Sequence, residues 1–223
     1  MKKDKKIQMV INIVTVINII VIIILGYHLI VKSKYNVRYI ESIAKKSMKY
    51  YNYMIEIEKE DMLTKEVERQ KVFQRENERR EELISQNITN WYANELRLHE
   101  DRNNHIKTYS FYGMCQDILY NDVDWWKYIN NENFKYIGSE NYNHSNCIIL
   151  YYEDANTEYH SGENIRVSYK IWVDEETGSV LKEEQYSEGK LIEVTKYNIQ
   201  FNCVTDKEID LPNIEGFKEI KQN

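Results

Sequence analysis

Residues 165–204 read IRVSYKIWVDEETGSVLKEEQYSEGKLIEVTKYNIQFNCV, a pattern of three consecutive β-strands joined by two tight turns. In the first segment, between Ile165 and Val173, apolar residues fall on every second position, which is the period of a strand with one buried face. The turns are expected around Gly178, which can take a positive φ without steric cost, and around Gly189. Alternation returns in the third segment. The stretch therefore predicts an antiparallel β-meander.

Charge is distributed unevenly along the 223 residues. Residues 1–49 contain nine Lys and one Arg against one Asp and one Glu, a balance of +8. Because the net charge of the whole chain is −6, the remaining 174 residues carry −14. An acidic domain repels phosphate backbones, so nucleic acid is not an expected partner. The basic residues of the first segment flank an apolar stretch, which is where anionic lipid headgroups would lie.

That apolar stretch covers residues 7–31 and predicts a membrane anchor. About twenty helical residues at 1.5 Å each span about 30 Å, the thickness of a bilayer core. A cleaved signal peptide is the rival interpretation, but Leu25–His28 is a poor small-residue cleavage site. We therefore expect a basic cytoplasmic tail (1–6), a transmembrane signal anchor (7–31) and an extracytoplasmic α+β domain (32–223). Basic residues on both sides of the anchor do not settle its orientation, and the outer location of the domain follows the usual behaviour of N-terminal anchors.

The segments between the anchor and the meander include patterns typical of helices and patterns typical of strands. Residues 62–86 are rich in charged side chains, and the sequence leaves open whether they form a solvated helix or a charged edge hairpin. The other expected elements are a helix over 36–49, a strand over 51–57, strand-like segments over 88–111, a helix over 113–131, and strands over 134–137 and 147–152 separated by a turn-rich 138–145.

Sequence motifs for catalysis are not found. The chain has no Walker loop, no GxGxxG and no nucleophile elbow, and its five His lack a paired metal spacing. We therefore expect no enzymatic activity, no cofactor and no metal site. The abundant Trp and Tyr side chains either fill the concave side of a curved sheet or line a ligand groove.

Residues 169–182, YKIWVDEETGSVLK, resemble the WxDxxTGxxLK hairpin of LolA-like lipoprotein-carrier domains and RseB-like periplasmic sensor domains. They are also similar to membrane-anchored relatives in Gram-positive bacteria. The resemblance continues through residues 188–202 and, more weakly, back to 138–150. It implies a strongly curved antiparallel half-barrel with helices over its concave face. In the carriers that cavity holds acyl chains, and in the sensors it detects mislocalised lipoproteins.

Taken together, these features predict an α+β chain with an N-terminal transmembrane helix followed by such a half-barrel. The expected cavity is apolar, is lined by Ile171, Val173 and Tyr197, and is covered by a helix over 114–130 that contributes Trp126. The resemblance implies no catalytic residues.

The leading functional hypothesis is a membrane-anchored extracytoplasmic binding or sensing domain with a hydrophobic ligand, either a lipid or a lipoprotein. A second hypothesis is a structural or interaction subunit of a membrane complex. It would contact a membrane-protein partner through Asn12 and Thr15 of the anchor and through the charged segment 60–86. A third is a cell-wall glycan-binding domain that uses exposed Tyr and Trp.

Overall fold

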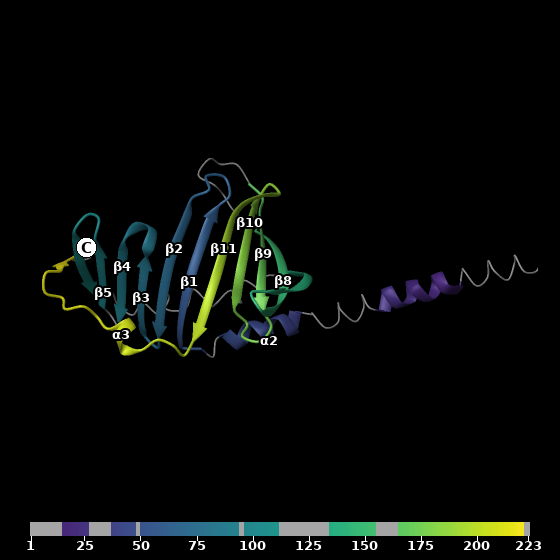
Figure 1. Cartoon of the computed structure of the whole chain (residues 1–223), viewed down its shortest axis with the longest axis horizontal. Coiled ribbons are helices and arrows are strands. Elements are labelled where there is room, and N and C mark those ends of the chain that lie inside the picture. Colours follow the sequence, from purple (N-terminus) through teal and green to yellow (C-terminus); the bar gives the residue numbers. More distant parts are fainter. Residues whose placement is uncertain are drawn as a thin grey trace, which may run out of the picture. The chain divides into compact units, whose positions relative to one another are not determined.

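The computed structural model describes residues 15–26, 37–47, 50–93, 96–111, 134–154 and 165–220. The chain divides into two compact units, residues 1–42 and 43–223, and each is described by itself. In the first unit, residues 15–26 are helical (Figure 1). Their apolar side chains are exposed, as for Ile22 at 67%. Among the described residues, no helix combines the length and the hydropathy needed to cross a bilayer. The anchor over 7–31 stays a prediction.

The second unit is built on one large β-sheet, in which the described residues form twelve strands in the order β12-β6-β5-β4-β3-β2-β1-β11-β10-β9-β8-β7 (Figure 1). Neighbouring strands pair antiparallel except for the short parallel pair of β12 with β6. The strands are β1 (Asn52–Asp61), β2 (Val67–Arg75), β3 (Glu78–Leu83), β4 (Ile88–Ala93), β5 (Leu96–Asp101), β6 (Ile106–Phe111), β7 (Lys135–Tyr142), β8 (Ser145–Asp154), β9 (Val167–Asp174), β10 (Val180–Ser187), β11 (Lys190–Phe201) and β12 (Lys218–Glu219). The helices are α2 (Val37–Ser47), the 3-10 turn η1 (Ile84–Gln86) and α3 (Asp206–Ile209).

The predicted meander is confirmed as β9, β10 and β11. Its two turns contain Gly178 and Gly189, and both glycines have a φ of +77°. Gly178 also meets the end of α2, because a Cβ built on it would lie 2.1 Å from the backbone oxygen of Ile43. The meander is less regular than the alternation suggests, since the register shifts between Val180 and Lys182 on β10.

Strand alternation gives the sheet two faces. The side that carries Ile55 and its register partners is termed the Ile55 face, and the opposite side is termed the Glu56 face. On the Ile55 face, Ile55 packs with Val72 of β2 and with Ile199 of β11. The Glu56 face has its own buried cluster on β8 to β10, formed by Cys147, Ile149, Trp172 and Leu181. Both faces of the meander region are therefore packed.

The charged stretch 62–86 is a hairpin, β2 and β3, which resolves the open alternative in favour of strands. The expectation that it lies at an edge is wrong, because β2 pairs with β1 and β3 pairs with β4. An interior position is feasible because charged side chains on neighbouring strands neutralise one another, as Lys71 and Glu56 do at 2.6 Å.

The turn between β7 and β8 is shorter than the expected 138–145. Strand β7 continues to Tyr142, and the reversal uses Asn143 and His144, with φ values of 49° and 66°. Asn tolerates the left-handed region better than most residues, which allows so tight a reversal. The strand over 51–57 and the helix over 36–49 are confirmed as β1 and α2. The helix predicted over 113–131 lies outside the described residues.

The sheet is curved and unclosed. Tyr142 of β7 and Lys71 of β2 line one cavity, although six strand positions separate them and a flat sheet would place them about 29 Å apart. The amino group of Lys182 on β10 also lies 5.9 Å from the Tyr142 ring, across three strand positions. In the described part of the chain, β7 and β12 end the strand order without pairing to each other. This architecture fits the half-barrel that the hairpin resemblance implies.

Candidate ligand cavity

A cavity of about 620 Å³ lies beside the central strands β1, β2 and β11. This volume is within the range of small-molecule sites in proteins. Its described lining comes from the three strands, from η1 and from the β7–β8 turn: Glu56, Ile57, Glu58, Arg69, Gln70, Lys71, Ile84, Tyr142, Asn143, Lys196, Tyr197 and Asn198. Segments that are distant in the sequence therefore build one site.

The charged lining belongs to the Glu56 face. Glu56 pairs with Lys71 at 2.6 Å and accepts a hydrogen bond from Asn198 at 3.1 Å. Glu58 pairs with Arg69 at 3.3 Å and with Lys196 at 3.1 Å. Each carboxylate thus sits on β1 between donors from β2 and β11, as the register requires.

The electrostatics of this network favour ionised carboxylates. Hydrogen bonds from Lys71 and then from Asn198 lower the pKa of Glu56. Hydrogen bonds from Lys196 and then from Arg69 lower the pKa of Glu58. These side chains are partly exposed, so water screens the pairs and each contributes little to stability. With three cations against two carboxylates among its described residues, the cavity has a balance of +1.

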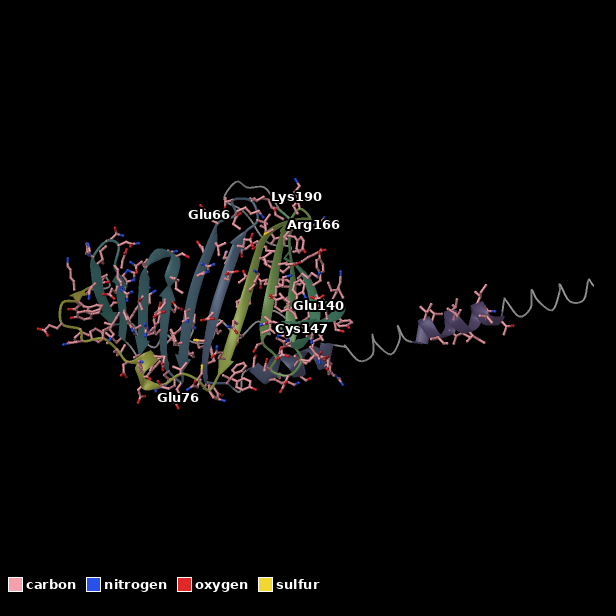
Figure 2. The ribbon with its side chains drawn as sticks, in the orientation of Figure 1. Glu66, Glu76, Glu140, Cys147, Arg166 and Lys190 are labelled. Atoms are coloured by element: carbon pink, nitrogen blue, oxygen red, sulfur yellow. The ribbon has the colours of Figure 1, made fainter. Side chains whose placement is uncertain are left out.

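On its β7–β8 side, the cavity borders a packed cluster around the Trp172 ring. The indole N–H of Trp172 donates to the carboxylate of Glu140, and the amino group of Lys182 lies 4.2 Å from the Trp172 ring. Tyr142 packs against the same buried cluster. Figure 2 shows Glu140 and Cys147, which are register partners on β7 and β8, close together in this region. The cluster holds Tyr142 where it lines the cavity.

The residues predicted to line a cavity have different positions in the structure. Ile171 and Val173 are 2% and 0% exposed on β9, within the packed core of the Ile55 face. Tyr197 lies on β11 among the residues around the cavity, but its register with Ile57 puts its side chain on the Ile55 face. Trp126 lies outside the described residues. Ligand contact by these four residues stays a prediction.

The charged lining was missed by the sequence reasoning. The sequence pattern that could have predicted this lining is the alternation of charged residues in 56–60 and 67–71. This alternation brings opposite charges together only when the two segments pair antiparallel. Because the sequence leaves the conformation of 62–86 open, it does not reveal that pairing. Among the described residues, no three His, Cys, Asp or Glu side chains gather in an arrangement that could hold a metal ion.

No protein-family model matches the chain, and no curated protein matches it. Similar solved structures are found. An uncharacterised conserved protein from Thermus thermophilus has a TM-score of 0.54 at 8% identity, over 81% of this chain and 98% of that one. MucB has a TM-score of 0.45 at 12% identity, over 79% of this chain and 62% of that one. An outer membrane lipoprotein-sorting protein domain from Vibrio parahaemolyticus has a TM-score of 0.37 at 12% identity, over 78% and 97% of the two chains.

These likenesses concern the fold alone. The Thermus structure shares the sheet architecture over nearly its whole length. The similar structures also include a LolA superfamily protein from Nitrosomonas europaea, so the kinds of protein to which residues 169–182 were compared are among them.

Proposed function

We propose that this chain is a membrane-anchored extracytoplasmic binding domain that holds an amphiphilic ligand, a lipid or the acyl group of a lipoprotein. The site is the cavity between β1, β2, β11 and the β7–β8 turn. The observation that carries the proposal is this open cavity of about 620 Å³ beside the central strands of the sheet.

The lining supports an amphiphile because it combines two chemistries. Ile84 and the ring of Tyr142 offer apolar surface, which suits an acyl chain, whereas the side chains of Ile57 and Tyr197 belong to the opposite, Ile55 face. The ion-paired row on β1, β2 and β11 has a balance of +1, which suits an anionic headgroup. The resemblance of the 169–182 hairpin to lipoprotein carriers agrees with such a ligand.

The same lining supports binding rather than catalysis. A general acid or base works best with a pKa near the operating pH. The pKa values of Glu56 and Glu58 are instead lowered by their hydrogen-bond donors, so both carboxylates stay ionised near neutral pH. The proposed role is to hold a ligand without transforming it.

The membrane location is taken from the sequence. Residues 7–31 are long and apolar enough to cross a bilayer, and the helix over 15–26 exposes large apolar side chains such as Val16, Ile20 and Ile23. Exposure of this kind suits lipid better than water. An anchored domain would take up its ligand near the membrane surface rather than carry it away.

The test compares the ligands that co-purify with three full-length proteins in maltoside detergent. Each protein is extracted with organic solvent, and the extract is analysed by mass spectrometry. In Asn198→Trp, the indole occupies the cavity from β11. Gln200→Trp is the matched control, because Gln200 lies on the same strand and the same face but is not part of the described lining.

We expect one amphiphile to be enriched with the wild type and the control, and to fall roughly tenfold in Asn198→Trp. Detergent-embedded anchors carry bulk lipid in all three samples, so the comparison isolates the cavity. Equal ligand recovery from Asn198→Trp and Gln200→Trp would contradict the proposal.

A further inference from the structure

The Ile55 face changes from apolar to polar across β2 to β6. One line of register partners crosses these five strands, and every member has a polar group: Gln74, Arg79, Tyr92, Arg97 and Ser110. Gln74, Arg79 and Ser110 are only 3%, 4% and 7% exposed. A buried polar line on a sheet face is costly unless its groups are satisfied.

In part of this line, the charges compensate each other. Arg79 holds the Oε1 atom of Glu81 through its Nε at 2.7 Å and through its Nη2 at 2.6 Å. The hydroxyl of Tyr92 donates to Oε2 of the same carboxylate at 3.4 Å. Burial, followed by the charge of Glu81, raises the pKa of Tyr92 to about 12. Tyr92 therefore stays a neutral donor, and the charges of Arg79 and Glu81 compensate each other.

Arg97 is the uncompensated member. Its guanidinium lies 5.4 Å from the centroid of the Tyr92 ring, which holds it in place by stacking. Its Nε is buried and has no acceptor among the described residues, and no described carboxylate pairs with it. At the other end of the line, the buried Oε1 of Gln74 likewise has no donor in the described structure.

A hydroxyl and an imidazole share this face with Arg97. Ser110 on β6 is its register partner and is buried beside it. His99 lies two residues along β5 on the same face, and its Nδ1 lies 2.8 Å from Oδ1 of Asn90. That contact fixes the imidazole ring. Among the described residues, the line thus has an arginine without a carboxylate partner and a hydroxyl on the neighbouring strand.

We propose that Arg97, together with the hydroxyl of Ser110, is a binding site for one phosphate group. The fork of an arginine can donate two parallel bonds to a phosphate, and the remaining phosphate oxygens can accept from the hydroxyl of the adjacent strand. The phosphate can come from a soluble phosphate ester or from a phospholipid headgroup. The site lies on β4 to β6, away from the lining strands of the cavity, and it does not rest on the function proposed above.

The test observes Arg97 directly. The full-length protein is labelled with ¹⁵N-arginine in maltoside micelles, and the Nε–H resonance of Arg97 is followed during titration with inorganic phosphate or with dihexanoyl-phosphatidylglycerol. Arg97→Gln assigns the resonance and removes the charge, and binding to this variant is read from backbone amide shifts. Arg102→Gln is the matched control, since Arg102 is an exposed arginine just past the end of the same strand and pairs with Glu100.

We expect saturable shifts in the wild type, affinity lowered roughly tenfold by Arg97→Gln, and affinity within about twofold for Arg102→Gln. Saturation with inorganic phosphate identifies a soluble source, whereas saturation with the lipid alone identifies a headgroup. If Arg97→Gln does not fold, Ser110→Ala should weaken binding several-fold. Wild-type affinity in a folded Arg97→Gln protein, or no saturable shift with either probe, overturns the proposal.

Discussion

Gly178 and Gly189 form a natural pair for testing how the meander is fixed to α2. Both have a φ of +77°, where a side chain is strained. A Cβ on Gly178 would lie 2.1 Å from the backbone oxygen of Ile43 and 3.1 Å from the backbone nitrogen of Ser47. A Cβ on Gly189 would meet nothing within 4 Å. Replacing each by Ala therefore separates backbone strain from the close approach of a helix.

The expected magnitudes follow from these two effects. Gly189→Ala introduces only the strain of a left-handed backbone, which costs about 1–2 kcal/mol. Gly178→Ala introduces the same strain and must also push the end of α2 away, because the backbone oxygen of Ile43 is held by its helix. Ile43 is fully buried there, and exposing a side chain of its size costs about 1.5–3 kcal/mol. The sum for Gly178→Ala is roughly 3–5 kcal/mol.

The assay is urea unfolding of the full-length proteins in maltoside, followed by tryptophan fluorescence, with thermal unfolding as a second readout. For a chain of this size 1 kcal/mol corresponds to about 2–4 °C, so Gly178→Ala should lower the midpoint by roughly 6–20 °C. Gly189→Ala should lower it by roughly 2–8 °C. Equal destabilisation by the two substitutions would refute the reasoning, because it would mean that the contact with Ile43 carries no energy.

Two further predictions concern the core and a buried acid. Leu98 is 0% exposed, so Leu98→Ala should lower the free energy of unfolding in urea by about 2–5 kcal/mol. Leu96 is a partly exposed residue on the same strand and face, so Leu96→Ala should lower it by less than half as much. Burial, and then repulsion by Glu193, raises the pKa of Glu183, and Lys59 opposes the shift. Because the folded state then binds more protons, stability is lost as pH rises from about 4 through the raised pKa. Glu183→Gln should therefore unfold at higher urea than the wild type at pH 7 and at a similar concentration near pH 4; a difference that does not change with pH would contradict this assignment.

The sequence was most informative where local rules act alone. Period-two alternation and two glycine-containing turns were sufficient to predict β9, β10 and β11 with nearly their observed bounds. The same rules could not reveal the register shift at Val180–Lys182, because a bulge depends on how the neighbouring strand pairs. Local patterns also could not predict that residues 62–86 lie inside the sheet, because their charged side chains are neutralised only once they pair with β1.

Local sequence patterns also could not predict the cavity. Alternation correctly groups Ile171 with Val173 on one face of β9, but it contains no information on whether that face is filled or open. Openness depends on the curvature that brings Tyr142 over strands six positions away, and on which side chains the facing segments supply. Such contacts join residues far apart in the sequence, so they follow from topology and not from any local pattern.

One sheet therefore presents two chemically different regions, and the strand order explains why they stay separate. Around β1 and β11, the Glu56 face carries the ion pairs of the cavity floor, while the Ile55 face behind it is packed with apolar side chains. From β3 to β6 the arrangement reverses: the Ile55 face carries Arg79, Tyr92 and Arg97, and the Glu56 face buries Leu98. Polar side chains on opposite faces of one sheet cannot share a ligand. An amphiphile in the cavity and a phosphate at Arg97 are therefore independent occupants, and loss of one should leave the other in place.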